Sequence, residues 1–134
     1  MHDIDDIFVA RLMSTDLHTV TPDTLVEAAA ATLLDNEISS VLVVESDRLL
    51  GILTSTDFVE IVARSQPKAE TTVERYMTTD PVTTTAQDPV SAVAATMIER
   101  SIHHVPVVDD GTPIGIITTS DLAAYVSGTE PLSP

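Results

Sequence analysis

Apolar residues recur with helical spacing over residues 25–36. The positions i, i+3, i+4, i+7 and i+8 are taken by Val26, Ala29, Ala30, Leu33 and Leu34. This is the pattern of a helix with one buried face. Thr24 and Glu27 have capping-box spacing at its start. The sequence therefore predicts a helix that begins after Thr24 and ends near Asn36.

Runs of apolar, largely β-branched residues predict strands around this helix. A short strand is expected at 18–20, ahead of the helix. Two further strands, Val41–Glu45 and Leu49–Leu53, are separated by the turn dipeptide Ser46-Asp47, which favours a hairpin. A last helix follows from its cap at Thr54 to about residue 64. The predicted order is β-α-β-β-α.

The chain repeats itself at an offset of 64 positions. Residues 9–62 align with 73–126 without a gap, and 21 of these 54 pairs are identical. The second copy has Asp88 as the expected helix cap, Pro89 at the first helical position and a hairpin turn at 109–111. A half of about 60 residues is a marginal folding unit. The sequence therefore predicts an α/β (α+β) fold of two β-α-β-β-α repeats related by a pseudo-two-fold axis.

The repeat sets the expected domain boundaries. The first domain covers residues 5–65 and the second covers 73–127, with a linker at 66–72 and a tail at 128–134. A helical start at residues 4–13 precedes the first repeat, and its counterpart in the second is 73–77.

Composition excludes several classes of function. The net charge is -15, with 21 Asp+Glu against 6 Lys+Arg, so the chain lacks the basic footprint of a nucleic-acid binder and should not dock on anionic membranes. It has no cysteine and therefore no disulfide or thiolate metal site. No apolar run reaches membrane-spanning length, and the start is acidic where a signal peptide would be basic. We expect a cytoplasmic protein.

The charge also suggests a high-salt environment. Hydrophobic residues make up 43% of the chain, and the mean hydropathy is +0.21, so the acidic residues belong to the surface of a folded protein. A dense acidic surface stops repelling itself when the Debye length falls to ~3 Å in molar salt. We therefore predict that the protein comes from a halophile; the alternative is an ordinary acidic protein.

The ordered motifs resemble a tandem pair of CBS domains, also called a Bateman module. They are the segment 77–83 (MTTDPVT), the Ala-rich helix after it, the segment 102–109 (IHHVPVVD) and the twice-occurring signature Gly-x-x-Thr-x-x-Asp at 51–57 and 115–121. The resemblance covers about residues 5–127. It implies a stand-alone pair that binds an adenosine compound in clefts between the repeats, forms a homodimer and modulates a partner protein that the sequence does not identify. The expected ligands are AMP, ADP, ATP or S-adenosylmethionine, with no further cofactor except Mg²⁺ accompanying ATP.

The resemblance also assigns roles to the repeated signature. Asp57 and Asp121 would hold the ribose hydroxyls, since a carboxylate can accept two hydrogen bonds, and Thr54 and Thr118 would add a contact to ribose or phosphate. The same Thr-x-x-Asp spacing is also that of a capping box, which alone could explain both pairs without a ligand.

Two clefts are expected from the resemblance. Cleft A joins Met13, His18, Ile38, Ser39, Ile116, Thr118 and Asp121. Cleft B joins Met77, Val82, Ile102, His103, His104, Ile52, Thr54 and Asp57. Apolar walls with few polar anchors suit adenosine. The alternative is that Met13, Met77, Ile38 and Ile102 are core residues.

The pair His103-His104 is the sharpest difference between the repeats, because the first has Ser39-Ser40 there. A histidine can donate to phosphate, which favours an AMP-like ligand in cleft B. A metal site is not expected, since neighbours in an extended segment point to opposite sides. No catalytic motif is present, so we expect no enzyme activity. The main alternative is a dimerisation or interaction scaffold with no ligand.

Overall fold

The computed structural model describes residues 7–64 and 71–128. The chain divides into two compact units. One is formed by residues 18–81 and is called the continuous unit below. The other joins the segment up to residue 17 with the segment from residue 82 onward and is called the split unit.

The continuous unit is built on a four-stranded sheet. Its strands, in the order β1-β2-β3-β4, are Thr19–Val20, Ser40–Glu45, Arg48–Thr54 and Thr78–Thr79. β1 runs parallel to β2, and the other neighbours are antiparallel. The predicted hairpin is confirmed as β2–β3, which turns through Ser46 and Asp47, both with positive φ. The strand β4 comes from the far side of the linker and closes the edge beside β3.

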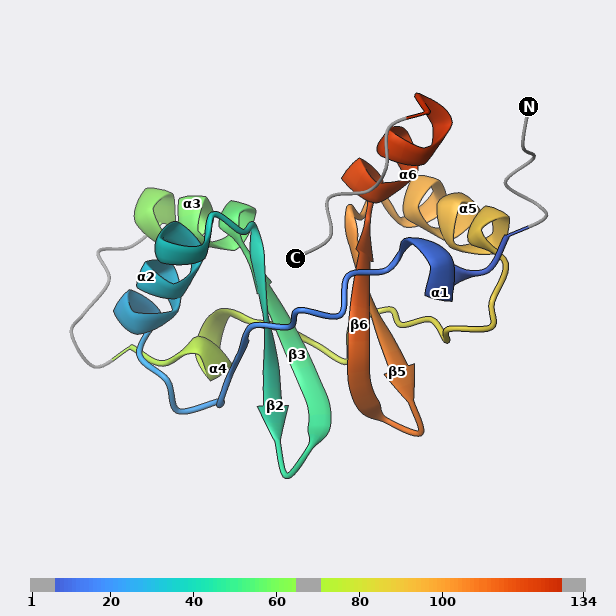
Figure 1. Ribbon diagram of the computed structural model, residues 1–134. Coiled ribbons are helices and arrows are strands. Elements are labelled where there is room, and N and C mark those ends of the chain that lie inside the picture. The colour runs from blue at the N-terminus through green and yellow to red at the C-terminus, as the bar shows by residue number, and fades with distance from the viewer. Residues whose placement is uncertain (1–6, 65–70, 129–134) are drawn as a thin grey trace. The chain divides into compact units, whose positions relative to one another are not determined.

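Helices α2 (Val26–Asn36) and α3 (Ser55–Arg64) pack near the ends of β2 and β3 that lie away from the hairpin turn (Figure 1). The short helix α4 (Val73–Tyr76) precedes β4. The core consists of Val26, Ala29, Leu33, Val41, Val43, Leu53, Ile61 and Val73. Alternate residues of β2 and one stripe of α2 supply most of it, as the sequence periodicity predicts.

The split unit repeats this plan with shorter edges. Its hairpin is formed by β5 (His104–Asp109) and β6 (Thr112–Thr118). Single bridges replace the outer strands: Thr84 pairs parallel with Val107, and Ser14 pairs antiparallel with Ile116. Helices α5 (Val90–Arg100) and α6 (Thr119–Val126) correspond to α2 and α3, and α1 (Val9–Leu12) corresponds to α4.

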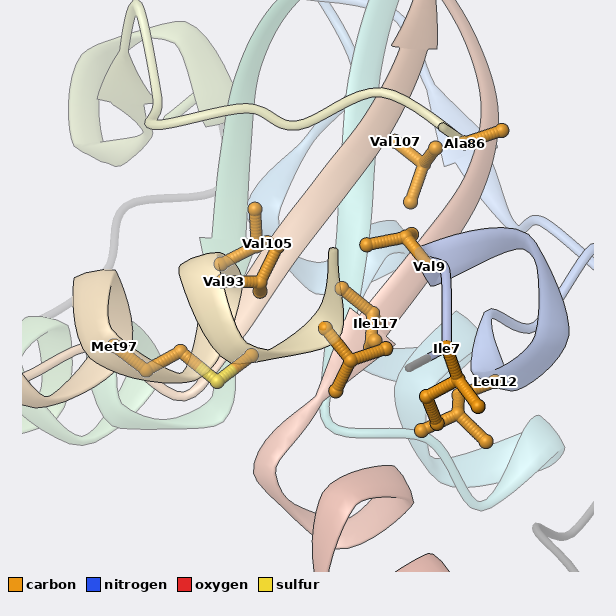
Figure 2. Packing of buried hydrophobic residues seen from close by; sticks show 10 residues of the cluster. Ile7, Val9, Leu12, Ala86, Val93, Met97, Val105, Val107 and Ile117 are labelled. Carbon is orange, nitrogen blue, oxygen red and sulfur yellow. The ribbon is translucent and has the colours of Figure 1, made fainter. Parts of the chain in front are cut away.

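The N-terminal segment belongs to the core of the second repeat. Ile7, Val9 and Leu12 pack in one cluster with Val93 and Met97 of α5 and with the hairpin residues Val105, Val107 and Ile117 (Figure 2). The backbone follows, because Val9 N–H donates to Asp88 O at 2.9 Å. The compact units therefore interleave relative to the predicted domains 5–65 and 73–127. Of those predicted ranges, residues 5–6, 65–70 and 129–134 lie outside the described residues.

Two predicted helix caps are wrong. Helix α2 has Leu25 as its N-cap and α5 has Pro89, and neither has a side-chain cap. Thr24 Oγ1 instead accepts from Thr21 N–H at 3.1 Å, and Asp88 Oδ2 accepts from Thr85 N–H at 2.9 Å. Both side chains close the turn before the helix, a use that competes with capping for the same residue types.

No helix within residues 7–64 and 71–128 combines the length and the apolar character that crossing a bilayer requires.

Candidate functional site

The first Thr-Asp pair lies where β3 passes into α3. Thr54 N–H donates to Asp57 Oδ2 at 2.8 Å, and the Thr54 hydroxyl donates to the same oxygen at 3.1 Å. Asp57 stands in the first turn of α3, so its side chain turns back to the end of the strand. Both residues are half-buried.

The second pair reproduces this geometry where β6 passes into α6. Thr118 donates to Asp121 Oδ2 through its N–H at 2.8 Å and its hydroxyl at 3.1 Å. Asp121 N–H donates back to Thr118 Oγ1 at 3.3 Å, which completes a capping box. The capping role expected from the spacing is therefore confirmed for Thr118 and Asp121.

Capping leaves half of each carboxylate unused. All the hydrogen bonds to Asp57 and Asp121 reach Oδ2. Within the described part of the chain, Oδ1 of each carboxylate accepts no hydrogen bond. A carboxylate oxygen offers two lone pairs, so each Oδ1 can still bind a hydroxyl donor while Oδ2 holds the helix start.

The environment of Asp121 is partly desolvated. Burial raises the pKa of Asp121, while the N–H and hydroxyl of Thr118 act to lower it. A carboxylate withdrawn from water in this way binds a hydroxyl donor more strongly than one in bulk solvent.

A methionine lies against a glycine beside each pair. Met77 packs over Gly51 of β3, and Met13 packs over Gly115 of β6. The next residue of each strand is Ile52 or Ile116, and the strand ends at the Thr. Each unit by itself thus brings together a Met, an Ile, a Thr and an Asp, in the pairings that the sequence predicts.

The residues before each hairpin also lie beside the Thr of their own unit. Ser55 N–H donates to Ser39 O at 2.9 Å, and Thr119 N–H donates to His103 O at 3.0 Å. His104 stands directly opposite Thr118, as Ser40 stands opposite Thr54, and opposite residues share a face of the sheet. The sequence grouped Ser39 with Asp121, and both histidines with Asp57; these groupings join residues of different units and stay predictions.

The remaining predicted residues occupy less polar positions. His18 O accepts from Leu42 N–H at 3.1 Å. Val82 lines a surface cavity of about 310 Å³ in the split unit. Ile38 and Met77 pack against the core of the continuous unit, and Ile102 and Met13 against that of the split unit. All four are half-buried, so the core interpretation accounts for part of each side chain.

The glycines are the functional positions that sequence reasoning missed. They were read only as markers of the signature, although a glycine inside a strand often signals a close backbone approach. The part of the chain that the structure describes contains no cluster of three or more His, Asp or Glu able to hold a metal ion.

Comparison with known proteins gives a consistent family match. The CBS domain family model matches residues 9–64 and 73–128. The crystal structure of the CBS domain pair of protein MJ0100, in complex with 5′-methylthioadenosine and S-adenosylmethionine, is 30% identical, with a TM-score of 0.83 over 89% of this chain and 98% of that chain. The CBS domain-containing protein YhcV of Bacillus subtilis is 27% identical over 115 residues, which cover 86% of this chain and 82% of YhcV.

Larger relatives contain a similar segment. Homoserine O-acetyltransferase of Methanohalobium evestigatum is 28% identical over 121 residues, which cover 89% of this chain but 24% of the enzyme. The present chain therefore matches about a quarter of that protein.

Proposed function

Because this chain belongs to the CBS domain family, with two copies of the domain in tandem, we propose that it is a regulatory module that binds an adenosine compound and thereby modulates a partner protein. The observation that carries the proposal is the second carboxylate oxygen of Asp57 and of Asp121, which capping leaves open to a ribose hydroxyl. A ligand that binds one arrangement of the module better shifts the population toward it. The module itself would carry out no chemistry.

The ligand-contacting groups follow from the two Thr-Asp junctions. In the continuous unit we propose Asp57, Thr54, Ile52, Met77, Ser39, Ile38 and His18. In the split unit we propose Asp121, Thr118, Ile116, Met13, His103, His104, Ile102 and Val82. The carboxylates would hold ribose, and the apolar groups would form the walls for adenine.

Charge ranks the ligands. A net charge of -15 opposes a polyanion at low salt, so ATP should require high salt or Mg²⁺. AMP, adenosine and cationic S-adenosylmethionine face a smaller barrier. S-Adenosylmethionine and 5′-methylthioadenosine, which the MJ0100 pair binds, are the natural first probes, and the histidine pair favours AMP-like nucleotides.

Thermal shift with single variants tests the proposal. In molar KCl, at least one adenosine compound should raise the melting temperature of the wild type. Asp57→Ala or Asp121→Ala should reduce the shift and also destabilise the helix start. Asp57→Asn and Asp121→Asn keep an oxygen for the cap, so they should retain the melting temperature of the free protein while reducing the shift. The absence of a shift with every adenosine compound would contradict ligand sensing.

His104 gives a test of the phosphate contact. His104→Ala should weaken AMP more than adenosine, because only AMP carries the phosphate that the imidazole would meet. Calorimetric titration of both ligands measures the ratio, and Ser40→Ala at the equivalent position of the first repeat is the matched control. Equal losses for AMP and adenosine would contradict a phosphate role for His104.

The partner proposed first is a second copy of this chain. Leu34 and Val62 in one repeat, and their equivalents Ile98 and Val126 in the other, are all between 72% and 80% exposed. A second copy offers the same duplicated pairs, which suits a self-complementary interface. Light scattering at molar KCl should show a dimer, and Leu34→Ser with Ile98→Ser should give a monomer. A monomeric wild type would contradict self-association. This surface also favours the scaffold alternative, which the ligand titration separates from sensing.

The setting remains part of the proposal. We propose that the module works in a cytoplasm of high salt, where its acidic surface is screened.

A further inference from the structure

The two connections between the units each begin at a strand glycine. The chain passes from the split unit to the continuous unit after residue 17 and returns after residue 81. Shortly before these points, the segment that follows Met13 crosses Gly115 and the segment that follows Met77 crosses Gly51. Each glycine lies three residues before the Thr of the proposed ligand site.

Backbone hydrogen bonds hold each crossing segment on its strand. Ser14 N–H donates to Ile116 O at 2.8 Å, and Ile116 N–H donates to Ser14 O at 2.9 Å. In the continuous unit, Thr78 and Thr79 pair with Ile52 and Gly51. Asp80 N–H adds a bond to Leu50 O at 3.2 Å.

These crossings leave no room for a side chain on the glycines. A Cβ atom on Gly51 would lie 2.7 Å from Thr78 O and 2.7 Å from Met77 Sδ. On Gly115 it would lie 2.9 Å from Ser14 O and 2.8 Å from Met13 Sδ. The methionine side chain could rotate away, but the carbonyl oxygen can move only with its segment. The requirement is steric, since neither glycine has a positive φ.

We propose that Gly51 and Gly115 are positioning residues of the two ligand sites. Each keeps its methionine against the strand that ends at the Thr-Asp pair, and each ties the following connection to that strand. A ligand that displaces β3 or β6 would therefore pull directly on the chain that joins the units. The ligand arm of this inference rests on the proposed function, whereas its structural arm does not.

Hydrogen exchange and ligand titration of glycine variants test the inference. Gly51→Ala should expose the Asp80 amide, and Gly115→Ala the Ser14 and Ile116 amides, with protection reduced at least tenfold. Each should weaken binding of S-adenosylmethionine at least tenfold. Gly128→Ala is the matched control, because nothing lies within 4 Å of the carbon it adds, and it should match the wild type in both measurements.

A second set of variants separates the side chain from the backbone. Met77→Ala should keep the Asp80 amide protected while weakening S-adenosylmethionine, and it remains informative if the glycine variants do not fold. Met77→Ala added to Gly51→Ala should not restore protection, since the Thr78 carbonyl still meets the new methyl group. Restored protection, or wild-type protection in both single glycine variants, would overturn the inference. If the wild type binds no adenosine compound, the proposed function fails, and the exchange data alone still decide the positioning role.

Discussion

At the scale of single residues, Thr84 is the only buried polar side chain recorded within the described ranges, with 6% of its surface exposed. Its hydroxyl donates to Asp88 Oδ2 at 2.6 Å. Hydrogen bonds from Thr84 and Thr85 lower the pKa of Asp88, against a smaller opposing effect of burial. The first repeat has Val20 and Thr24 at the positions of Thr84 and Asp88, so this charged turn belongs to the second repeat alone.

The lowered pKa of Asp88 predicts a pH-dependent contribution to stability. The folded state binds this proton less tightly than the unfolded state, so the contribution is present above the unfolded pKa of about 4 and is lost as the pH falls through the lower folded pKa. The difference in unfolding free energy between the wild type and Asp88→Asn should therefore shrink from about pH 6 to about pH 3. Urea unfolding measures it, with Thr24→Ala as an uncharged control whose cost stays constant. A pH-independent cost of Asp88→Asn would contradict this explanation.

The two hairpin turns predict a stabilising substitution. Asp47 has φ 64 and its equivalent Gly111 has φ 85, a region that costs a side chain about 1 kcal/mol or more and costs glycine little. Asp47→Gly should raise the unfolding free energy by about 0.5 kcal/mol after the entropy of glycine is offset. The reverse change, Gly111→Asp, should lower it by a similar amount. Opposite signs in urea unfolding would show that φ does not decide these turns.

At the scale of elements, periodicity predicted the helices and strands well and their neighbours less well. The apolar stripe of α2 and the hairpin β2–β3 follow from local spacing, which the sequence displays directly. Thr24 and Asp88 were expected to cap helices, but their side chains close turns instead, because Ser, Thr and Asp can satisfy either set of backbone donors. The sequence also could not show which repeat receives the segment 7–12, since its apolar residues match those of 73–77 and either sheet could accept them.

The placement of this segment predicts unequal effects of two neighbouring substitutions. Val9 is fully buried in the split unit, whereas Phe8 is 57% exposed. Val9→Ala should lower the unfolding free energy by about 2 kcal/mol, through lost burial and a small cavity. Phe8→Ala, the matched control, should cost less than about 0.5 kcal/mol. Thermal and urea unfolding compare them, and an equal or larger cost for Phe8→Ala would contradict the packing of residues 7–12 in this core.

At the scale of the whole molecule, the repeat predicted two similar units, while the interleaved chain course came only from the structure. The pairs Thr54–Asp57 and Thr118–Asp121 could be found by their spacing. The oxygen that each carboxylate keeps open could not, because it depends on which oxygen the Thr groups reach. The glycine crossings were hidden for the same reason: a close approach involves two segments distant in sequence.

The net charge of -15 predicts stability that rises with salt. The Debye length falls from ~10 Å at 0.1 M to ~3 Å at 1 M, which weakens the mutual repulsion of the surface carboxylates. The melting temperature should rise over this range of KCl, and the dependence should flatten near the pI of about 4.2. A melting temperature that falls as KCl rises would contradict adaptation to high salt.

The most direct test of the central claim is calorimetric titration of S-adenosylmethionine, 5′-methylthioadenosine and AMP in molar KCl. The wild type should bind at least one of them saturably, and the Asp57→Asn/Asp121→Asn double variant, with its caps retained and its melting temperature unchanged, should lose that binding. Binding that the double variant retains in full, or a wild type that binds none of the three, would contradict the assignment of these carboxylates to an adenosine ligand.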